Sequence, residues 1–298
     1  MRKIPLEQRI IESVVELLRI SETRLPIDII ESLKKAYNEE TETLAKTQLK
    51  AILDNIKYAS EKNIPICQDT GLITFYVKLG DEFPIRSKLN SLLIEAVKRA
   101  TEEVPLRPNA VNPWTGKNSG DNTGKYIPYI HYELVPGDSL EISVMPKGGG
   151  SSYVAKLYSI PPAEKVKGLK KAVINAVYDA GPKPCPPIIV GVGVGGTEDL
   201  AMILAKKALL RPINIRNEDE NIAKLEEELL GLLNSLEIGA MGFGGKTTVL
   251  GVNIEWAHRH PATFLVGIAI GCWAMRRGTL IIHKDGSAEI ISHGVKIQ

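Results

Sequence analysis

The sequence predicts a mixed α/β (α+β) fold, with a helical N-terminal layer followed by a core built on a mixed sheet. Up to Pro65, apolar residues recur at helical spacing with charged residues between them. Beyond Pro65, runs rich in β-branched and aromatic residues alternate with helical patterns and glycine-rich turns. No internal repeat, low-complexity tract or linker forces a second domain. We therefore expect a single domain over residues 1–298, with the helical layer at 1–62 and the core at 63–285.

The elements of the core follow in order. Residues 72–77 form a strand, and Ser87 can cap a helix whose apolar side includes Leu93. Strands at 130–135 and 140–145 flank Pro136-Gly137-Asp138, which predicts a hairpin. The later elements expected are a helix ending near Gly181, a strand and glycine turn from Ile188, helices at 197–210 and 219–233, and strands near 249–254, 262–270 and 279–283.

Residues 105–128 form a polar loop rich in proline, glycine and asparagine. A loop of this length without regular structure is uncommon inside a compact domain and is usually functional. Arg107 in this loop, and Lys147 before three glycines, are by default solvated charges. Their glycine- and proline-rich surroundings also make them plausible binders of a carboxylate through charge-assisted hydrogen bonds.

The composition is that of a soluble globular protein, with 44% hydrophobic and 24% charged residues. A net charge of +2 without a basic stripe gives no reason to expect binding to nucleic acid or acidic membranes. No apolar run reaches the ~20 residues of a membrane span. Three widely spaced cysteines argue against a disulfide framework and for a reducing compartment. We expect a cytoplasmic protein.

Two glycine-rich segments resemble nucleotide-binding motifs. Gly191-x-Gly193-x-x-Gly196 matches the dinucleotide fingerprint, but no strand ending in an acid follows at the required distance. Gly244-Gly245-Lys246-Thr247 resembles a phosphate-binding loop, but Ala240 occupies a glycine position and a strand pattern follows where a helix is needed. A tight turn is the favoured interpretation of the first segment, and a nucleotide-dependent enzyme that uses Gly191 to Gly196 is kept as an alternative. Nucleotide binding by the second segment is not expected.

The three cysteines stand beside residues that a buried thiol would not need. Cys67 precedes Gln68-Asp69, Cys185 lies between prolines, and Cys272 is followed after three residues by two arginines. Free cysteines are commonly buried as small hydrophobes, so a subunit without metal is the alternative. Three thiolates are one short of a closed four-cysteine site, and a four-iron cluster held this way keeps one iron open for catalysis. Zinc would normally require closer pairs of ligands.

His258 and His260, two residues apart, are compatible with an exposed turn or with ligands and proton-transfer groups on one face of a strand. The sequence leaves these two interpretations open.

Several ordered motifs together resemble the α subunit of the two-subunit class I fumarate hydratases, the iron–sulfur fumarase and L-tartrate dehydratase family. They span roughly residues 60–278. The motifs are Cys67-Gln68-Asp69-Thr70-Gly71, Arg107-Pro108-Asn109-Ala110-Val111, Thr115-Gly116-Lys117-Asn118-Ser119-Gly120-Asp121-Asn122, Met145-Pro146-Lys147-Gly148-Gly149-Gly150-Ser151, Pro184-Cys185-Pro186-Pro187, Gly242-Phe243-Gly244-Gly245-Lys246-Thr247-Thr248 and Cys272-Trp273-Ala274.

The resemblance implies a function for each group of residues. Cys67, Cys185 and Cys272 would hold a [4Fe–4S] cluster whose fourth iron has no protein ligand. The residues implied to face a dicarboxylate substrate are Gln68, Asp69, Arg107 and the backbone at Gly150, with His260 close to the site.

The reaction implied is reversible hydration of fumarate to (S)-malate, a step of the tricarboxylic acid cycle; tartrate or another dicarboxylate is the alternative substrate. Asp69 is the best candidate to protonate the leaving hydroxyl or to orient the attacking water. A single Arg107 is little to bind two carboxylates. The resemblance therefore implies a separate β subunit in a heterodimer or heterotetramer, which would supply further substrate ligands and the opposing base.

Overall fold

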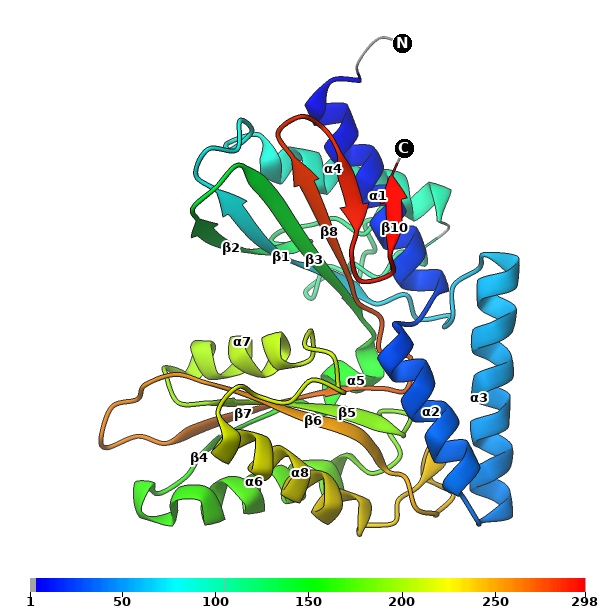
Figure 1. Cartoon of the computed structure of the whole chain (residues 1–298), viewed down its shortest axis with the longest axis vertical. Helices are drawn as coiled ribbons and strands as arrows, with labels where there is room; N and C mark the ends of the chain where they lie inside the picture. The colour runs from blue at the N-terminus through cyan, green and yellow to red at the C-terminus, as the bar shows by residue number, and fades with distance from the viewer. Residues whose placement is uncertain (1–3, 105, 298) are drawn as a thin grey trace. The chain divides into compact units, whose positions relative to one another are not determined.

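We analysed a computed structural model of the chain, which describes residues 4–104 and 106–297. Pro105, the first residue of the predicted loop, lies outside the described residues. The chain divides into two compact units, called unit 1 (Met1–Pro26, Asn55–Gly148 and Arg276–Gln298) and unit 2 (Ile27–Asp54 and Gly149–Met275). Each unit combines helices with a sheet (Figure 1), which confirms the predicted mixed α/β class.

The helices expected at the N-terminus are confirmed as α1 (Leu6–Thr23), α2 (Ile27–Glu39) and α3 (Thr43–Lys62). α1 packs within unit 1 and α2 within unit 2, while α3 runs across the boundary between them. The apolar face of α1 is buried against the sheet of unit 1, which explains its helical spacing of apolar residues.

Unit 1 contains a six-stranded sheet with the order β10-β9-β8-β3-β1-β2. Its strands are β1 (Leu72–Gly80), β2 (Tyr129–Val135), β3 (Ser139–Lys147), β8 (Gly278–His283), β9 (Ala288–Ile290) and β10 (Val295–Ile297). Helices α1 and α4 (Leu89–Glu103) pack together beside this sheet, and the core between them includes Val14, Phe75, Leu93 and Ile142.

The predicted hairpin between 130–135 and 140–145 is wrong, because β1 lies between β2 and β3. β1 pairs in parallel with β2 and antiparallel with β3. The connection from β2 to β3 therefore passes the end of β1, where the Glu82 N–H donates to the Gly137 carbonyl (2.9 Å) and the Gly137 N–H to Asp81 (2.8 Å). Nearly all of β1 is buried on both faces, so it occupies a central position in the sheet.

The predicted cap of α4 by Ser87 is also wrong. The cap position is Lys88, which already has helical dihedral angles and makes no side-chain capping bond. The Leu89 N–H donates to the Arg86 carbonyl (3.0 Å), so a backbone turn satisfies the first helical donor without the Ser87 hydroxyl.

Unit 2 contains a four-stranded sheet with the order β4-β7-β5-β6. Its strands are β4 (Lys156–Ser159), β5 (Ile188–Val194), β6 (Val249–Trp256) and β7 (Leu265–Gly271). Its helices after α2 are α5 (Gly149–Tyr153), α6 (Lys165–Ala180), α7 (Glu198–Ala208) and α8 (Glu220–Asn234), with short 3₁₀ turns at Pro162–Glu164 and Ala240–Gly242. α7 covers one face of the sheet, and α6 and α8 cover the other (Figure 1).

The glycines that resembled a dinucleotide fingerprint allow a helix to lie directly on the sheet. A Cβ atom at Gly191 would come 2.1 Å from the Ala205 carbonyl oxygen, and one at Gly193 would come 2.0 Å from that of Ala201. Both carbonyls belong to α7. The absence of side chains on β5 thus lets the α7 backbone pack against the strand, which explains the glycine spacing without a nucleotide.

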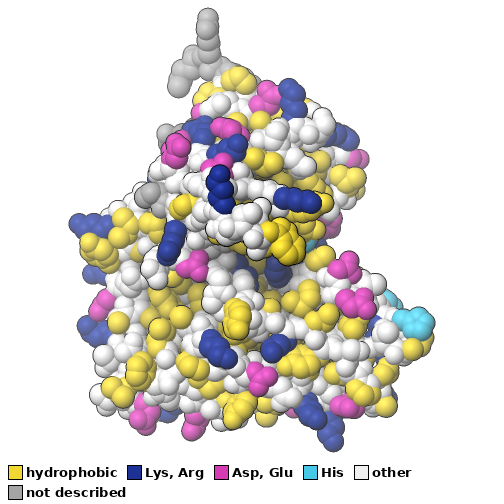
Figure 2. Space-filling model, turned by 180° about the vertical axis from the view of Figure 1, so that it is seen from behind, with side chains coloured by type: hydrophobic (Ala, Val, Ile, Leu, Met, Phe, Trp, Pro, Cys, Tyr) yellow, Lys and Arg dark blue, Asp and Glu magenta, His cyan; other side chains and the backbone are white. Residues whose placement is uncertain are grey.

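Charged side chains are dispersed over the visible surface. On the face shown in Figure 2, Lys and Arg side chains lie singly or in small groups, with acidic and hydrophobic ones between them. Within the described ranges, no helix combines the length and the apolar character needed to cross a membrane.

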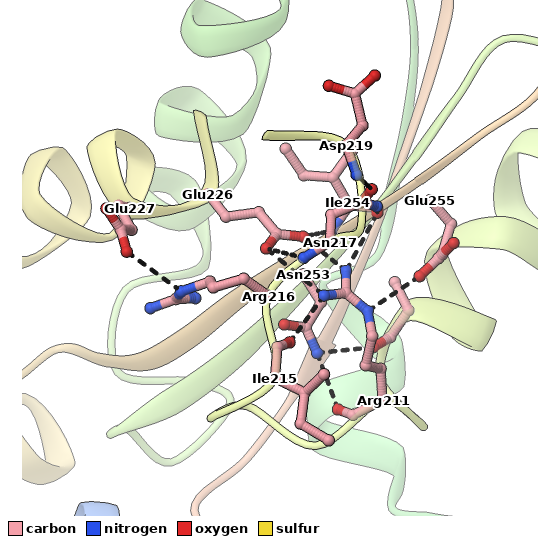
Figure 3. Close-up of polar contacts among 11 residues, drawn as sticks. Arg211, Ile215, Arg216, Asn217, Asp219, Glu226, Glu227, Asn253, Ile254 and Glu255 are labelled. Atoms are coloured by element: carbon pink, nitrogen blue, oxygen red, sulfur yellow. Dashed lines mark hydrogen bonds and ion pairs between the residues drawn. The ribbon is translucent and has the colours of Figure 1, made fainter. Parts of the chain in front are cut away.

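A buried polar network joins the segment between α7 and α8 to the end of β6 (Figure 3). Glu226 on α8 is fully buried and forms an ion pair with Arg211. The Glu226 carboxylate also accepts hydrogen bonds from the backbone N–H groups of Asn217 (3.1 Å) and Ile254 (2.8 Å). Arg211 in turn donates to Glu255 (3.1 Å). A buried charge is tolerated because all of these partners surround it.

We expect Glu226→Ala to lower the free energy of unfolding by roughly 3–5 kcal/mol, because it leaves the Arg211 guanidinium without its buried partner. Glu227, one residue later, is the matched control, since its side chain is 67% exposed and its ion pair with Arg216 lies at the surface. Glu227→Ala should change stability by less than about 1 kcal/mol. Urea unfolding measures both, and equal effects would show that the network does not stabilise the fold.

Candidate active site

Unit 1 brings together three of the predicted substrate-binding residues, Gln68, Asp69 and Arg107. The Thr70 hydroxyl accepts a hydrogen bond from the Arg107 N–H (3.1 Å) and donates to the Arg107 carbonyl (3.2 Å). This double link holds the start of the long loop against the segment that follows Cys67. The side chains of Gln68 and Arg107 are exposed and that of Asp69 is half-buried, so this edge of unit 1 presents two polar groups and a carboxylate.

The carboxylate of Asp69 is held in a fixed orientation. Its Oδ1 accepts hydrogen bonds from the Gly71 N–H (2.9 Å) and from the Asn109 side-chain amide (3.4 Å). Its Oδ2 lies against Gly148, where an added Cβ atom would come within 2.9 Å. Gly148 has no side chain and thus leaves room for the carboxylate of Asp69, which the sequence analysis named as the candidate acid.

Asn122 orders the long loop from within, a function that the sequence analysis missed. Its side chain is only 2% exposed. Its Oδ1 accepts from the Asn109 N–H (2.7 Å), and its Nδ2 donates to the Thr101 hydroxyl and to the Arg107 carbonyl (both 3.1 Å). The many asparagines of the loop could have indicated this function, because side-chain amides can form the hydrogen bonds that the backbone of an irregular loop lacks.

Unit 2 brings Cys185 and Cys272 together at one edge of its sheet. β5 begins after Cys185 and β7 ends before Cys272, and the two strands are antiparallel with Ile189 opposite Gly271. The Trp273 N–H donates to the Cys185 carbonyl (3.2 Å). Cys185 has a φ of +54°, a conformation that L-residues adopt at a cost.

Two glycine-rich segments, one at Gly150 and one around Met241, contact the backbone around Cys185. Gly150, at the start of α5, approaches the Lys183 carbonyl, since an added Cβ atom would lie 3.5 Å away. The Met241 N–H donates to the Pro186 carbonyl (2.8 Å). Glu40 holds the motif after Met241, since its carboxylate accepts a hydrogen bond from the Lys246 N–H (2.9 Å). The sequence analysis missed this residue.

Three half-buried cysteines that form no disulfide are a donor set of the kind that binds iron–sulfur clusters. Cys67 belongs to unit 1, whereas Cys185 and Cys272 belong to unit 2. Within either unit, the described residues contain no group of three or more His, Cys, Asp or Glu placed to hold a metal ion. The ligand function of the cysteines stays a prediction.

The structure does not bring His260 to the same edge of the sheet. His260 lies in the loop between β6 and β7, whereas Cys272 follows the last residue of β7. Because β7 is fully extended and rises about 3.3 Å per residue, it separates the loop from the cysteines by roughly 20 Å. Cys185 is equally remote, since it precedes β5, the antiparallel neighbour of β7. Unit 2 thus places His260 far from Cys185 and Cys272, and its function in the site stays a prediction.

A buried ion pair lies behind the Asp69 segment in unit 1. Glu22 at the end of α1 is fully buried and accepts a hydrogen bond from Arg276 (2.7 Å), which is 2% exposed. The Glu22 carbonyl accepts from the Ile66 N–H (2.9 Å), next to Cys67. Burial raises the pKa of Glu22 to about 7 against the opposing charge of Arg276, and the nearby Asp69 adds to the rise. A glutamate in an amphipathic helix normally indicates a surface position, so no sequence signal pointed to this pair.

A profile of the family described as Fumarate hydratase (Fumerase) matches residues 11–281. The chain belongs to the fumarate hydratase (Fumerase) family. This confirms the family inferred from the ordered motifs and makes the chain a member of a hydro-lyase family.

Curated relatives agree with this assignment over nearly the whole chain. The chain is 46% identical over 281 residues to the putative L(+)-tartrate dehydratase subunit alpha of Methanocaldococcus jannaschii, which covers 93% of this chain and 99% of the relative. It is 40% identical over 286 residues to the L(+)-tartrate dehydratase subunit alpha of Escherichia coli O157:H7, which covers 96% and 94%. The protein of Escherichia coli K12 with the same name is 39% identical over the same length.

The raised pKa of Glu22 predicts a pH-dependent stability for this fumarate hydratase family member. The folded protein keeps the Glu22 proton up to about pH 7, whereas the unfolded chain releases it near the ordinary value of 4.5. Between these values the folded state binds more protons, so the free energy of unfolding falls as the pH rises. Relative to Glu22→Gln, which cannot ionise, the native protein should lose up to roughly 3 kcal/mol between pH 4.5 and 8.

Urea unfolding at a series of pH values measures this difference. Glu16→Gln is the control, because it lies on the same helix with a side chain that is 41% exposed. A difference between native protein and Glu22→Gln that stays constant with pH would refute the raised pKa.

Proposed function

We propose that the chain is the α subunit of a [4Fe–4S]-dependent hydro-lyase that interconverts fumarate and (S)-malate. The proposal rests on two observations. Cys185 and Cys272 lie close together at one edge of the sheet in unit 2, and the Asp69 carboxylate is held in a fixed orientation near Cys67 in unit 1. L-tartrate dehydration is the second candidate, because the relatives described above carry that name.

Cys67, Cys185 and Cys272 are the proposed ligands of the cluster. When bound, a cluster with one iron free of protein ligands would supply Lewis acidity for the departing hydroxyl. The positive φ of Cys185 and the hydrogen bonds on either side of it support this assignment, because strained backbone is kept where the surrounding structure fixes it. The three cysteines, which form no disulfide, also support a reducing, cytoplasmic location.

The remaining residues would bind and protonate the substrate. Arg107 and Gln68, both exposed beside Asp69, would hold a carboxylate by charge-assisted hydrogen bonds. The backbone at Gly150 would contact the substrate from the Cys185 edge. In the dehydration direction, Asp69 would donate a proton to the leaving hydroxyl, the C–O bond would break, and water would depart. The proton on the neighbouring carbon would leave to a base on the partner, and its electron pair would form the double bond.

A partner β subunit is part of the proposal. One arginine among the proposed residues is little for a substrate with two carboxylates. The relatives named subunit alpha also support an assembly with a second kind of chain. The function inferred for His260 is kept, as an acid–base group of the same reaction.

The decisive experiment is an anaerobic assay of the chain produced with and without its partner subunit. We expect the complex to hydrate fumarate, with tartrate as the comparison substrate, and the chain alone to be nearly inactive. Cys67→Ser, Cys185→Ser and Cys272→Ser should each lose iron and the broad visible absorption of the cluster, because a serine hydroxyl is a poor iron ligand. Glu227→Ala is the control. A triple serine variant with full iron content would eliminate the proposed ligands.

Asp69→Asn should keep the iron content and the visible spectrum and lower kcat by roughly 10²- to 10⁴-fold. The amide keeps the oxygen that accepts from Gly71 but cannot deliver a proton. Asp54→Asn is the matched control, since Asp54 is an exposed residue of α3 paired with Lys50. An unchanged kcat in the Asp69 variant would remove this residue from the mechanism.

A further inference from the structure

Cys185 lies in a tight turn of unit 2, residues 182–187, which we call the cysteine turn. The Cys185 N–H donates to the Pro182 carbonyl (3.0 Å), and the Cys185 carbonyl accepts from the Trp273 N–H (3.2 Å). The φ of Cys185 is +54°, which a residue with a side chain adopts only at a cost. Contacts from outside the turn are therefore needed to keep the Cys185 side chain in one position.

A second turn of unit 2, residues 239–248, provides such contacts and is called the supporting turn. Its Met241 N–H donates to the Pro186 carbonyl (2.8 Å). A Cβ atom at Gly242 would come 2.5 Å from the Cβ atom of Pro182, so the two turns approach each other as closely as glycine allows. The supporting turn therefore contacts the cysteine turn on both sides of the thiol.

The supporting turn is costly to hold in one conformation. Glycine loses more backbone freedom on folding than any other residue. The Gly239 N–H donates to the buried Thr248 hydroxyl (3.1 Å), which fixes the two ends of the turn to each other. Gly245 and Lys246, in its second half, are contacted by another segment of unit 2. The residues of the turn with positive φ are Gly239, Met241, Gly242, Gly244 and Gly245.

That other segment contributes Glu40, which directly follows α2 and is only 2% exposed. Its Oε2 accepts a hydrogen bond from the Lys246 N–H (2.9 Å) and lies where a Cβ atom at Gly245 would come within 2.5 Å. Its Oε1 accepts from the N–H groups of Thr41 (2.8 Å) and Glu42 (2.9 Å), just before α3. One oxygen thus closes the connection between α2 and α3, and the other holds the supporting turn.

The negative charge of Glu40 suits it to this position. Burial by itself would raise the pKa of the Glu40 carboxyl group. The N–H groups that it accepts from and the ammonium group of Lys246 outweigh burial and hold this pKa below its ordinary value. At neutral pH both oxygens therefore act only as acceptors, and hydrogen bonds to a charged acceptor are stronger than those to a neutral one.

Two lysines fasten the same junction. The Lys246 ammonium donates to the Glu39 carbonyl (3.1 Å), and the Lys46 ammonium donates to the Glu40 carbonyl (3.0 Å). Both carbonyls lie at the C-terminal end of α2, where a positive charge is favourable. The supporting turn is thus bonded to the end of α2 through the backbone and the side chain of Lys246.

We propose that Glu40 is a positioning residue for Cys185. Glu40 holds the supporting turn through Lys246, and the supporting turn holds the cysteine turn through Met241 and Gly242. The proposal rests on the proposed function, in which Cys185 is a ligand of the cluster. Residues that bind a metal centre must be held within roughly 0.5 Å of their positions, so a loosened supporting turn should weaken the retention of iron.

Glu40→Gln tests this link with little change in size. The amide oxygen can still accept from Thr41 and Glu42, but the NH₂ group would face the Lys246 N–H, donor against donor. In the complex, freed of iron anaerobically with a chelator, we expect iodoacetamide to alkylate Cys185 roughly tenfold faster than in the native protein. Mass spectrometry measures the rate for each cysteine, and that of Cys67 should stay unchanged.

Two further readouts accompany the alkylation rate. Hydrogen exchange at the Met241 amide should become faster in Glu40→Gln, because its turn has lost a contact. The iron-loaded variant should release iron to a chelator roughly tenfold faster than the native complex. Glu39→Gln is the matched control, since this neighbouring side chain is 60% exposed, and it should leave all three rates unchanged.

Gly245→Ala approaches the same contact from the other side. The added Cβ atom would displace the Glu40 carboxylate, so this variant should also accelerate alkylation of Cys185 and leave Cys67 unchanged. Because both substitutions break one contact, the double variant should react no faster than the faster single variant. Effects that multiply in the double variant would show that Glu40 and Gly245 act independently, which contradicts the link.

Two other outcomes would overturn the proposal. Equal acceleration at Cys67 and Cys185 would mean that Glu40→Gln loosens the whole chain. An unchanged alkylation rate at Cys185, or unchanged iron release, would mean that Glu40 does not position this cysteine for the cluster. Alkylation and hydrogen exchange are measured without iron, so they separate this proposal from the proposed function. A native complex that binds no iron would refute the proposed function, whereas selective alkylation of Cys185 would still show the link from Glu40.

Discussion

The packing of α7 on the sheet of unit 2 depends on the close contact between its backbone and the glycines of β5. Side chains at Gly191 and Gly193 would overlap the carbonyls of α7, so the helix lies directly on the strand. β5 itself lies between β6 and β7, with which it pairs along its length. The two ends of the sheet then carry different chemistry, because Cys185 and Cys272 share one edge while the His260 loop occupies the other.

Unit 1 fixes its candidate residues with polar groups instead of close backbone packing. Thr70, Asn109 and Asn122 connect the Asp69 segment to the long loop through side-chain hydrogen bonds that satisfy backbone groups. Such a network is directional, so it sets the orientation of the Asp69 carboxylate as well as its position. Glu22 and Arg276 form a buried pair behind this segment. Burial raises the pKa of Glu22 to about 7, so Glu22 gains or loses its proton near neutral pH.

Much of the fold could be predicted because local patterns decide it. The helical spacing of α1 to α3, the buried run of β1 and the glycine after α6 each belong to one segment. The hairpin between β2 and β3 failed for the opposite reason. Its turn residues are compatible with a hairpin, but the pairing depended on β1, a strand distant in sequence that is buried on both faces. Likewise, the glycines of β5 fit a nucleotide motif until the position of α7 was known.

The sequence by itself indicated the family of this protein. The identities of the three cysteines, Asp69 and Arg107, and the order of their motifs, indicated the family that the profile match confirmed. Only the tertiary structure decided which of these residues lie near one another within each unit. Spacing along the chain carries no information on distance across a sheet, and His260 shows the consequence. It stands only twelve residues before Cys272, yet an extended strand puts the two at opposite edges.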